Sequence, residues 1–460
     1  MKDYGKAVQN FSLIYDRYQY KELIHIMSVL LITGNGFDLA NGLPTRYVDF
    51  MNYMDEAKDY YINEPSSNLD FIKSDGCKLS SYFVPMMSYR ILYEKAKELA
   101  EISKVEPMMA AYSAYRSYVG KLLGKNGRTM CEFPRNNALQ EGLMKDKHSG
   151  NKEKATKSFY EYNACMMYTF IHGNMWLDYF SELIKKDIGE NWIDFESEIC
   201  KVIEVVEDML IANQKGKVTK VLSSENKIKS ISDFMAMRKD TLNKSELVGT
   251  NGLISTLQSE LVIFVRCLEV YMLLIEQTPQ SFINKIPAID GLDSVDWLLN
   301  FNYTDTFIRH YPQGMGKNLY GSDFIHGKAG YNNLIIGIHE TLDENLENHL
   351  LECSYFKKYF QRIFFKTGME YKKWIPDKRK DNPYIVVYIF GHSLDVTDGE
   401  VLRYIILNEN VKKTVIFYHS QDSYVNLINN LTRIIGKDNL ITKTGNEEIV
   451  FHSSDDIIII

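Results

Sequence analysis

The fold of this chain is decided by its first apolar run, Ser28–Thr33 (SVLLIT), and by the loop GNGFDLANGLPT that follows at Gly34–Thr45. A short β-branched run that ends in glycine predicts a buried strand that leads into a tight turn. Glycines in such a turn allow backbone N–H groups to approach a pyrophosphate at the start of a helix. Leu39 stands where the common dinucleotide fingerprint has a third Gly or Ala, so a glycine turn without a ligand is the alternative.

Short apolar runs alternate with helical patterns in the last third of the chain. The runs are Ser294–Asn302, Leu334–Ile338, Tyr384–Phe390 and Thr414–Tyr418, and the helical segments are Asp343–Phe365, Asp398–Leu407 and Gln421–Ile435. Such alternation is typical of βαβ units around a parallel sheet. We therefore predict an α/β protein with a Rossmann-like parallel sheet, to which the terminal run Ile457–Ile460 could add an edge strand.

Between the first strand and this region the pattern is mostly helical, with too much helix for one crossover connection. The long helical segments are Ser88–Ser103, Phe159–Lys186, Trp192–Ala212 and Gly252–Gln277. We expect an N-terminal extension at 1–26, a Rossmann-like nucleotide-binding domain built from 27–60 and 290–460, and a large helical insertion at 61–289. Met27 directly precedes the first strand, so translation could begin there.

Composition narrows the class of protein. The 460 residues are 45% hydrophobic and 25% charged, as in globular proteins. A net charge of −7 gives no global basic field to attract nucleic acid. Six cysteines without CxxC spacing argue against a zinc ribbon and a disulfide framework. The most apolar stretch contains Arg266 and Glu269, which argues against a membrane-spanning helix. We expect a cytoplasmic protein without metal, membrane or nucleic-acid partner, and homo-oligomerisation stays open.

Polar residues follow the predicted strands, where residues past the carboxyl ends of parallel strands line a ligand crevice. Asn302, in the segment FNYTD, is placed to direct its amide at a substrate, and His326 is a candidate general base. Ser393 and Asp395 suit the ribose or phosphate of a nucleotide, whereas Asp398 suits a helix N-cap. For Asn302 and His326, ordinary turn and loop roles are the alternatives.

Five segments of the chain together resemble the AbiH family of bacteriophage abortive infection proteins. They are LLITGNGFDLANGLPTRYVDF, WIDFE at Trp192–Glu196, FNYT, IHG and GHSLDVTD, and they occur in this order between Ser28 and Leu440. The resemblance implies a role in bacterial defence against phage, set off by an unknown phage trigger. Asp194, within the WIDFE segment, and Glu198, just after it, share one face of a predicted helix. We expect this face to be exposed to solvent, with a cation or a sugar hydroxyl as the alternative ligand.

A more distant resemblance, in order and spacing, is to sirtuin-like NAD-consuming domains. It implies a sirtuin-like fold and NAD as the substrate. Under this resemblance His326 would be the base, and Asn302 would orient the attacking water or the nicotinamide ribose. The remaining implied ligand contacts are Gly34, Asn35, Gly36 and Pro44 at the pyrophosphate and Gly391, Ser393 and Asp395 at the adenosine side.

The chain departs from the sirtuin pattern at two positions near the implied site. Asp38 replaces a Ser, and Thr304 takes the position of an Asp, with Asp305 one residue late. Without a zinc ribbon, acyl-lysine removal is disfavoured. Hydrolysis of the nicotinamide–ribose bond remains, with Asp38 or Asp305 as the carboxylate that stabilises an oxocarbenium-like transition state.

The leading hypothesis is therefore an antiphage effector that binds and hydrolyses NAD. The alternative is a non-catalytic nucleotide-binding sensor or scaffold, which the two departures favour. A nuclease-type toxin finds no metal-binding constellation in the sequence to support it.

Overall fold

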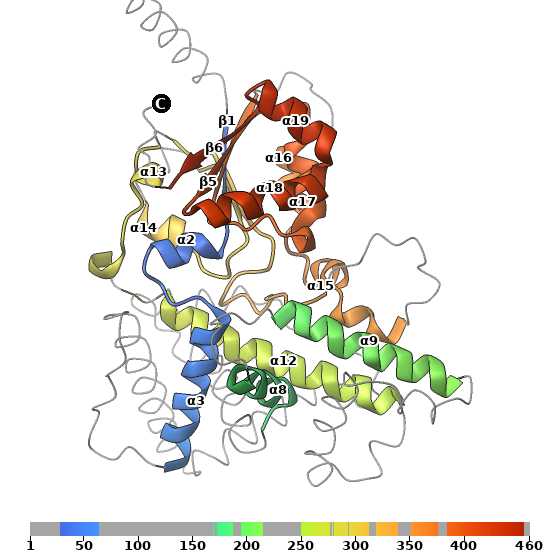
Figure 1. Cartoon of the computed structure of the whole chain (residues 1–460). Helices are drawn as coiled ribbons and strands as arrows, with labels where there is room; N and C mark the ends of the chain where they lie inside the picture. Colours follow the sequence, from blue (N-terminus) through green and yellow to red (C-terminus); the bar gives the residue numbers. More distant parts are fainter. Residues whose placement is uncertain are drawn as a thin grey trace, which may run out of the picture. The chain divides into compact units, whose positions relative to one another are not determined.

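The computed structural model describes residues 28–63, 169, 173–186, 195–214, 250–276, 278, 280–292, 294–311, 319–338, 351–375 and 384–454. These residues form two compact units (Figure 1). The first unit takes its described residues from Met1–Gly42, Ile283–Ile325 and Thr367–Ile460. The second takes them from Leu43–Phe282 and His326–Lys366.

A parallel sheet forms the centre of the first unit. Its described strands are β1 (Ser28–Thr33), β2 (Trp297–Asn300), β3 (Gly321–Phe324), β4 (Ile385–Phe390), β5 (Val411–Tyr418) and β6 (Ile449–Ser453). They pair in the order β3-β2-β1-β4-β5-β6, and every neighbouring pair is parallel. The predicted α/β class with a parallel sheet is thus confirmed. The strand order reverses at β1, which lies between β2 and β4.

Helices cover both faces of this sheet (Figure 1). Because side chains alternate along a strand, Leu30 and Ile32 face one layer of helices and Leu31 faces the other. The first layer holds α16 (Tyr371–Trp374), η4 (Val396–Asp398), α17 (Gly399–Ile406), α18 (Gln421–Ile435) and α19 (Lys437–Gly445). The second holds α2 (Asn35–Ala40), α13 (Pro287–Asp290) and α14 (Thr306–His310). Burial on both faces explains why the central strands β1 and β4 are almost continuously apolar.

The described part of the second unit is helical. Its elements are α3 (Tyr47–Asn63), α8 (Met175–Lys186), α9 (Phe195–Gln214), α12 (Thr250–Ile275), η1 (Gln280–Phe282), η3 (Leu351–Phe356) and α15 (Lys358–Phe365). Aromatic side chains join these helices: Phe195 of α9 stacks on Phe180 of α8 at 4.2 Å, and Phe264 of α12 lies edge-on to Phe50 of α3 at 5.5 Å. Among the helices that the structure describes, none combines the length and hydropathy needed to cross a bilayer.

Two sheet strands differ from the sequence prediction. Leu334–Ile338 is not a sheet strand, because it belongs to the second unit and makes only an isolated bridge between Ile338 and Lys357. The described edges of the sheet are instead β3 and β6. The strand β3 has the short, polar sequence GSDF. Its Asp323 is used for a hydrogen bond that it accepts from Tyr371 N at 3.0 Å. Such a strand has no apolar signature.

The helix predictions fare differently along the chain. Gln421–Ile435 is confirmed at both ends as α18, where Ser420 forms a capping box with Ser423. The single helix predicted over Asp343–Phe365 is wrong in its described part, because η3 and α15 meet at a break at Lys357. Ser88–Ser103 and Ile457–Ile460 lie outside the described residues.

Candidate functional site

The loops after β1 and β4 pack directly on each other within the first unit. Gly34 N donates to Phe390 O at 3.1 Å, and Gly36 N donates to Gly391 O at 2.8 Å. A Cβ on Gly36 would lie 2.8 Å from the Cα of Gly391, and one on Gly391, at φ +69°, would lie 2.1 Å from Phe37 N. These glycines are therefore required for loop packing. A phosphate at this loop would have to be held by groups other than the amides of Gly34 and Gly36.

Asp38, on α2 directly after β1, is a fully buried carboxylic acid. Its Oδ2 accepts a hydrogen bond of 2.5 Å from the hydroxyl of Thr304, which lies 3.0 Å from the hydroxyl of Thr306. Burial raises the pKa of Asp38 to about 7, while Thr304, Thr306 and Asn302 act in the opposite direction and the charge of Asp305 adds to the increase. A carboxyl group with a pKa near 7 can exchange a proton at neutral pH.

The side chain of Asn302 is buried, only 5% exposed. Neither its amide nitrogen nor its amide oxygen makes a hydrogen bond to any residue that the structure describes, and the same holds for Oδ1 of Asp38. The side chain of Asn302 lies close enough to Asp38 to lower the pKa of its carboxyl group. Buried polar groups are nearly always paired, so these three atoms are candidate contacts for a ligand group.

Asn300, two residues earlier, makes hydrogen bonds with both polar atoms of its side chain. Its Oδ1 accepts from Thr33 Oγ1 at 2.9 Å and from Asn302 N at 2.8 Å, and its Nδ2 donates to Thr304 O at 2.7 Å. Asn300 thus builds the turn after β2, and this turn places Asn302 beside Asp38. The carboxyl ends of the neighbouring strands β1 and β2 bring the two candidate residues together, as the sequence pattern predicts for a parallel sheet.

Asp305 has a structural partner. It occupies the N-cap position of α14, and its carboxylate pairs with the guanidinium of Arg309 one helical turn later. Of the two carboxylates that the sequence offers for catalysis, Asp38 therefore has the unpaired oxygen, and Asp305 is held by an ion pair.

In the loop after β4, the two predicted ligand residues make local contacts. Oδ1 of Asp395 accepts from Thr397 N at 2.9 Å and caps η4. Ser393 is exposed, and its backbone oxygen accepts from Asn430 Nδ2 at 2.9 Å. Their predicted contact with a nucleotide stays a prediction.

Asp398 differs from its predicted capping role. It stands at the N-cap position of α17 without a side-chain cap bond, and its Oδ2 lies 3.7 Å from Nε2 of buried His392. Nδ1 of His392 accepts from Leu394 N at 2.9 Å. The sequence pattern gave no sign of this His–Asp pair, although His392 directly follows the conspicuous strand β4.

Two predicted site residues, Pro44 and His326, belong to the second unit. The backbone oxygen of Pro44 accepts from the hydroxyl of Tyr271 at 2.7 Å. His326 lies with Nε2 3.5 Å from Nζ of Lys358, and Lys358 pairs with Glu196 at 2.7 Å. Both predicted residues therefore belong to a different unit from Asp38.

The contact between Glu196, Lys358 and His326 escaped sequence reasoning. In and after the WIDFE segment, the pattern drew attention to Asp194, which lies outside the described residues, and to Glu198. Glu198 bonds Tyr179 Oη at 2.9 Å and the exposed Lys201. The sequence feature that could have indicated Glu196 is the neighbouring Phe195. A buried aromatic residue at the start of a helix fixes the position of the acidic residue that follows it.

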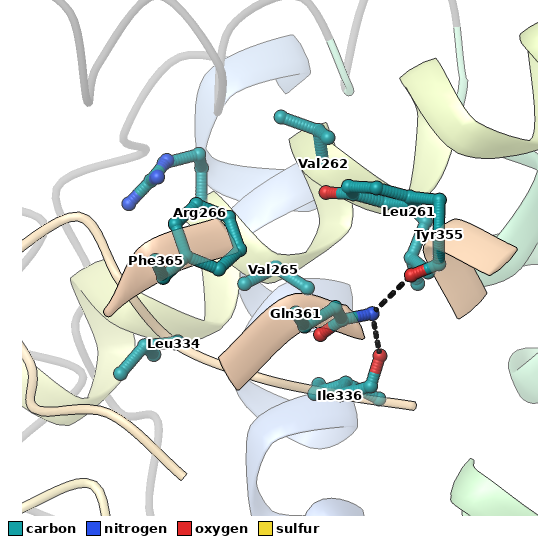
Figure 2. A pocket seen from close by; sticks show the side chains of 9 residues that line it. All are labelled: Leu261, Val262, Val265, Arg266, Leu334, Ile336, Tyr355, Gln361 and Phe365. Carbon is teal, nitrogen blue, oxygen red and sulfur yellow. Dashed lines mark hydrogen bonds between the residues drawn. The ribbon is translucent and has the colours of Figure 1, made fainter. Parts of the chain in front are cut away.

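A small hollow opens in the second unit beside α12 (Figure 2). Gln361 spans it by donating to the backbone oxygens of Ile336 and Tyr355, at 2.9 Å each (Figure 2). The hollow leaves only about 10 Å³ in which the centre of a water molecule could move, which is far too small for a nucleotide. Within the described ranges there is also no group of three or more His, Cys, Asp or Glu residues that could hold a metal ion.

The family model described as Bacteriophage abortive infection AbiH matches residues 30–420. This range contains all the candidate site residues named above. No curated protein and no solved structure matches the chain.

Proposed function

The chain belongs to the bacteriophage abortive infection AbiH family and is thus an abortive-infection protein of phage defence, and from this premise we propose that it acts in the cytoplasm by binding NAD and hydrolysing its nicotinamide–ribose bond. One observation carries the proposal. Asp38, with a pKa of about 7, lies at the carboxyl ends of β1 and β2 together with the amide of Asn302, which makes no hydrogen bond to a described residue.

The topology supports a nucleotide ligand. The strand order 3-2-1-4-5-6 is that of doubly wound folds that bind dinucleotides where the order reverses. In this chain the reversal lies at β1, whose following helix carries Asp38.

In the proposed reaction, the oxygen of a water molecule forms a bond to C1′ of the nicotinamide ribose. The bond from C1′ to the nicotinamide nitrogen breaks, and nicotinamide leaves with the electron pair. Asp38 faces the positive charge that develops on the ribose, as carboxylates do in glycoside cleavage. The water proton passes to a base, for which His326 and the unpaired Oδ1 of Asp38 are the candidates.

The other predicted residues take supporting roles in this proposal. Asn302 orients the water or the ribose, and Ser393 and Asp395 contact the adenosine side. Asn35 and Pro44 flank the pyrophosphate, together with the glycines of the two packed loops. The resident chemistry needs no metal ion.

A second candidate function is a nucleotide-binding sensor or scaffold without catalysis. It is favoured by the ion pair between Asp305 and Arg309, because the sirtuin pattern has a catalytic Asp where this chain has Thr304. The engaged amides of Gly34 and Gly36 point in the same direction.

Measurement of NAD in phage-infected cells and with the purified full chain separates the two functions. We expect NAD loss with the wild type and none with Asp38→Asn, Asn302→Leu or His326→Ala. Glu400→Gln is the matched control, since Glu400 is an exposed acid of the same unit. Infected cells that arrest while their NAD stays constant would rule out hydrolysis. Nucleotide binding by the purified protein would then point to the sensor.

A further inference from the structure

Three side chains from distant parts of the sequence meet in the interior of the second unit. Lys358, at the start of α15, lies between the carboxylate of Glu196 on α9, at 2.7 Å, and the imidazole Nε2 of His326, at 3.5 Å. The side chain of Lys358 is only 4% exposed and that of Glu196 13%. An ammonium group so far from water needs a counter-charge, and Glu196 provides it.

The backbone that carries His326 is held in place on its far side. His326 O accepts from Ile335 N at 2.8 Å. Oε1 of Glu269, on α12, accepts from the backbone amides of Gly330 and Asn332 at 2.9 Å each, and Glu269 pairs with Arg266. The position of the imidazole relative to Lys358 is therefore fixed by two helices, α12 through the loop and α9 through Glu196.

The contact between Lys358 Nζ and His326 Nε2 favours one position for the ring hydrogen. An ammonium group has three N–H donors and no acceptor, so the nitrogen that faces it must be the acceptor. In a neutral imidazole the other nitrogen, Nδ1, then bears the hydrogen. A protonated imidazole would instead set an N–H group and a second positive charge against Lys358.

We propose that Lys358, anchored by Glu196, is a positioning residue that holds His326 as a neutral imidazole with its hydrogen on Nδ1. The effect on NAD cleavage rests on the proposed function. There, His326 would enter the reaction unprotonated, as a base must, and the orientation of its ring would be set before substrate binds. The assignment of the hydrogen itself is independent of any reaction.

The test is ¹⁵N NMR of the ring nitrogens in full-length protein that contains ¹⁵N-histidine, without NAD. The signals of His326 are identified by their loss in His326→Gln. We expect a protonated Nδ1 and an unprotonated Nε2 in the wild type. In Lys358→Met we expect the form with hydrogen on Nε2 to become the major one, because the donor that excludes it is gone.

Two further variants keep the test decisive where Lys358→Met does not fold. Lys358→Arg retains a donor and should retain the hydrogen on Nδ1, whereas Glu196→Gln removes the anchor and should increase the Nε2–H form. Lys201→Met is the control, since Lys201 is 54% exposed and pairs with Glu198 on the same helix. It should leave the His326 signals unchanged.

A wild-type protein with hydrogen on Nε2 would overturn the proposal, and so would an unchanged spectrum in Lys358→Met or Glu196→Gln. NAD turnover that survives His326→Ala would instead refute the catalytic role of His326 and leave the assignment intact.

Discussion

Replacement of Asn302 by leucine gives the sharpest test of the candidate site, because it separates stability from function. The Asn302 amide is buried, and neither of its polar atoms makes a hydrogen bond to a described residue. Leucine has nearly the same size and loses no hydrogen bond. A buried polar group without a hydrogen-bond partner costs about 1–3 kcal/mol of folding free energy. Asn302→Leu removes this cost, so the variant should be as stable as the wild type or more stable by about 1–2 kcal/mol.

The matched control is Asn300→Leu, in the same turn. Three hydrogen bonds are lost there, with Thr33, with the backbone amide of Asn302 and with the backbone oxygen of Thr304. At about 1 kcal/mol for each bond, and more where a buried partner stays unpaired, the loss should be at least about 3 kcal/mol. Asn300→Leu should therefore lower the urea midpoint of unfolding, whereas Asn302→Leu should leave it unchanged or raise it.

The assay is urea unfolding of the purified chain at pH 7, combined with measurement of NAD turnover. We expect Asn302→Leu to be as stable as the wild type and inactive. Loss of stability comparable to that of Asn300→Leu would show that the Asn302 amide has partners in the folded protein. Full activity in a stable Asn302→Leu variant would show that its amide is not needed by a ligand. Either result refutes the reasoning.

The remaining predictions concern one titration, one ion pair and one loop contact. The folded state holds the proton of Asp38 more tightly than the unfolded chain, so its contribution to stability is complete below pH about 4 and is lost as the pH rises to about 7. Three pKa units correspond to roughly 4 kcal/mol, and urea unfolding should show Asp38→Asn gaining on the wild type by an amount of this order between pH 4 and pH 8. Lys358→Met should cost up to about 3 kcal/mol because it removes the counter-charge of Glu196, whose side chain is only 13% exposed. The double variant Glu196→Leu/Lys358→Met should recover most of this loss in the same assay, and a double variant less stable than the single one would contradict it. Gly36→Ala should lower the melting temperature without any ligand present, because its Cβ would meet the backbone of Gly391, and an unchanged melting temperature would show that the loops can separate.

The strands with an apolar signature could be predicted from the sequence, and the polar ones could not. Ser28–Thr33 and Ile385–Phe390 lie in the middle of the sheet, where burial on both faces requires apolar residues on both sides. The edge strand Gly321–Phe324 has one neighbouring strand and carries a buried Asp323 that holds a loop. Its sequence therefore resembles a turn, and Leu334–Ile338 resembles a strand because it is buried without belonging to the sheet.

Some residues of the candidate site could also be predicted from the sequence, and others could not. Asn302 was predictable because residues after a parallel strand meet at the carboxyl edge. The choice between Asp38 and Asp305 was not, since it depends on Arg309, which lies one helical turn after Asp305 and pairs with it. Glu196 and Lys358 are separated by 162 positions, the difference of their residue numbers, and only the packing of α9 and α15 brings them together. No local pattern encodes such a contact.

The buried polar groups at the turn after β2 are the strongest argument that this edge of the sheet has a function. A turn that only had to connect β2 to α14 could place an apolar side chain at position 302, because Asn300 already supplies the hydrogen bonds that shape it. The chain instead buries the amide of Asn302 and Oδ1 of Asp38 without a hydrogen bond to any described residue, and the pKa of Asp38 is raised to about 7. Each of these features lowers stability in the absence of a ligand. Their concentration within one strand-to-helix turn, next to the point where the strand order reverses, is the expected consequence of selection for a bound group with both hydrogen-bond donors and acceptors.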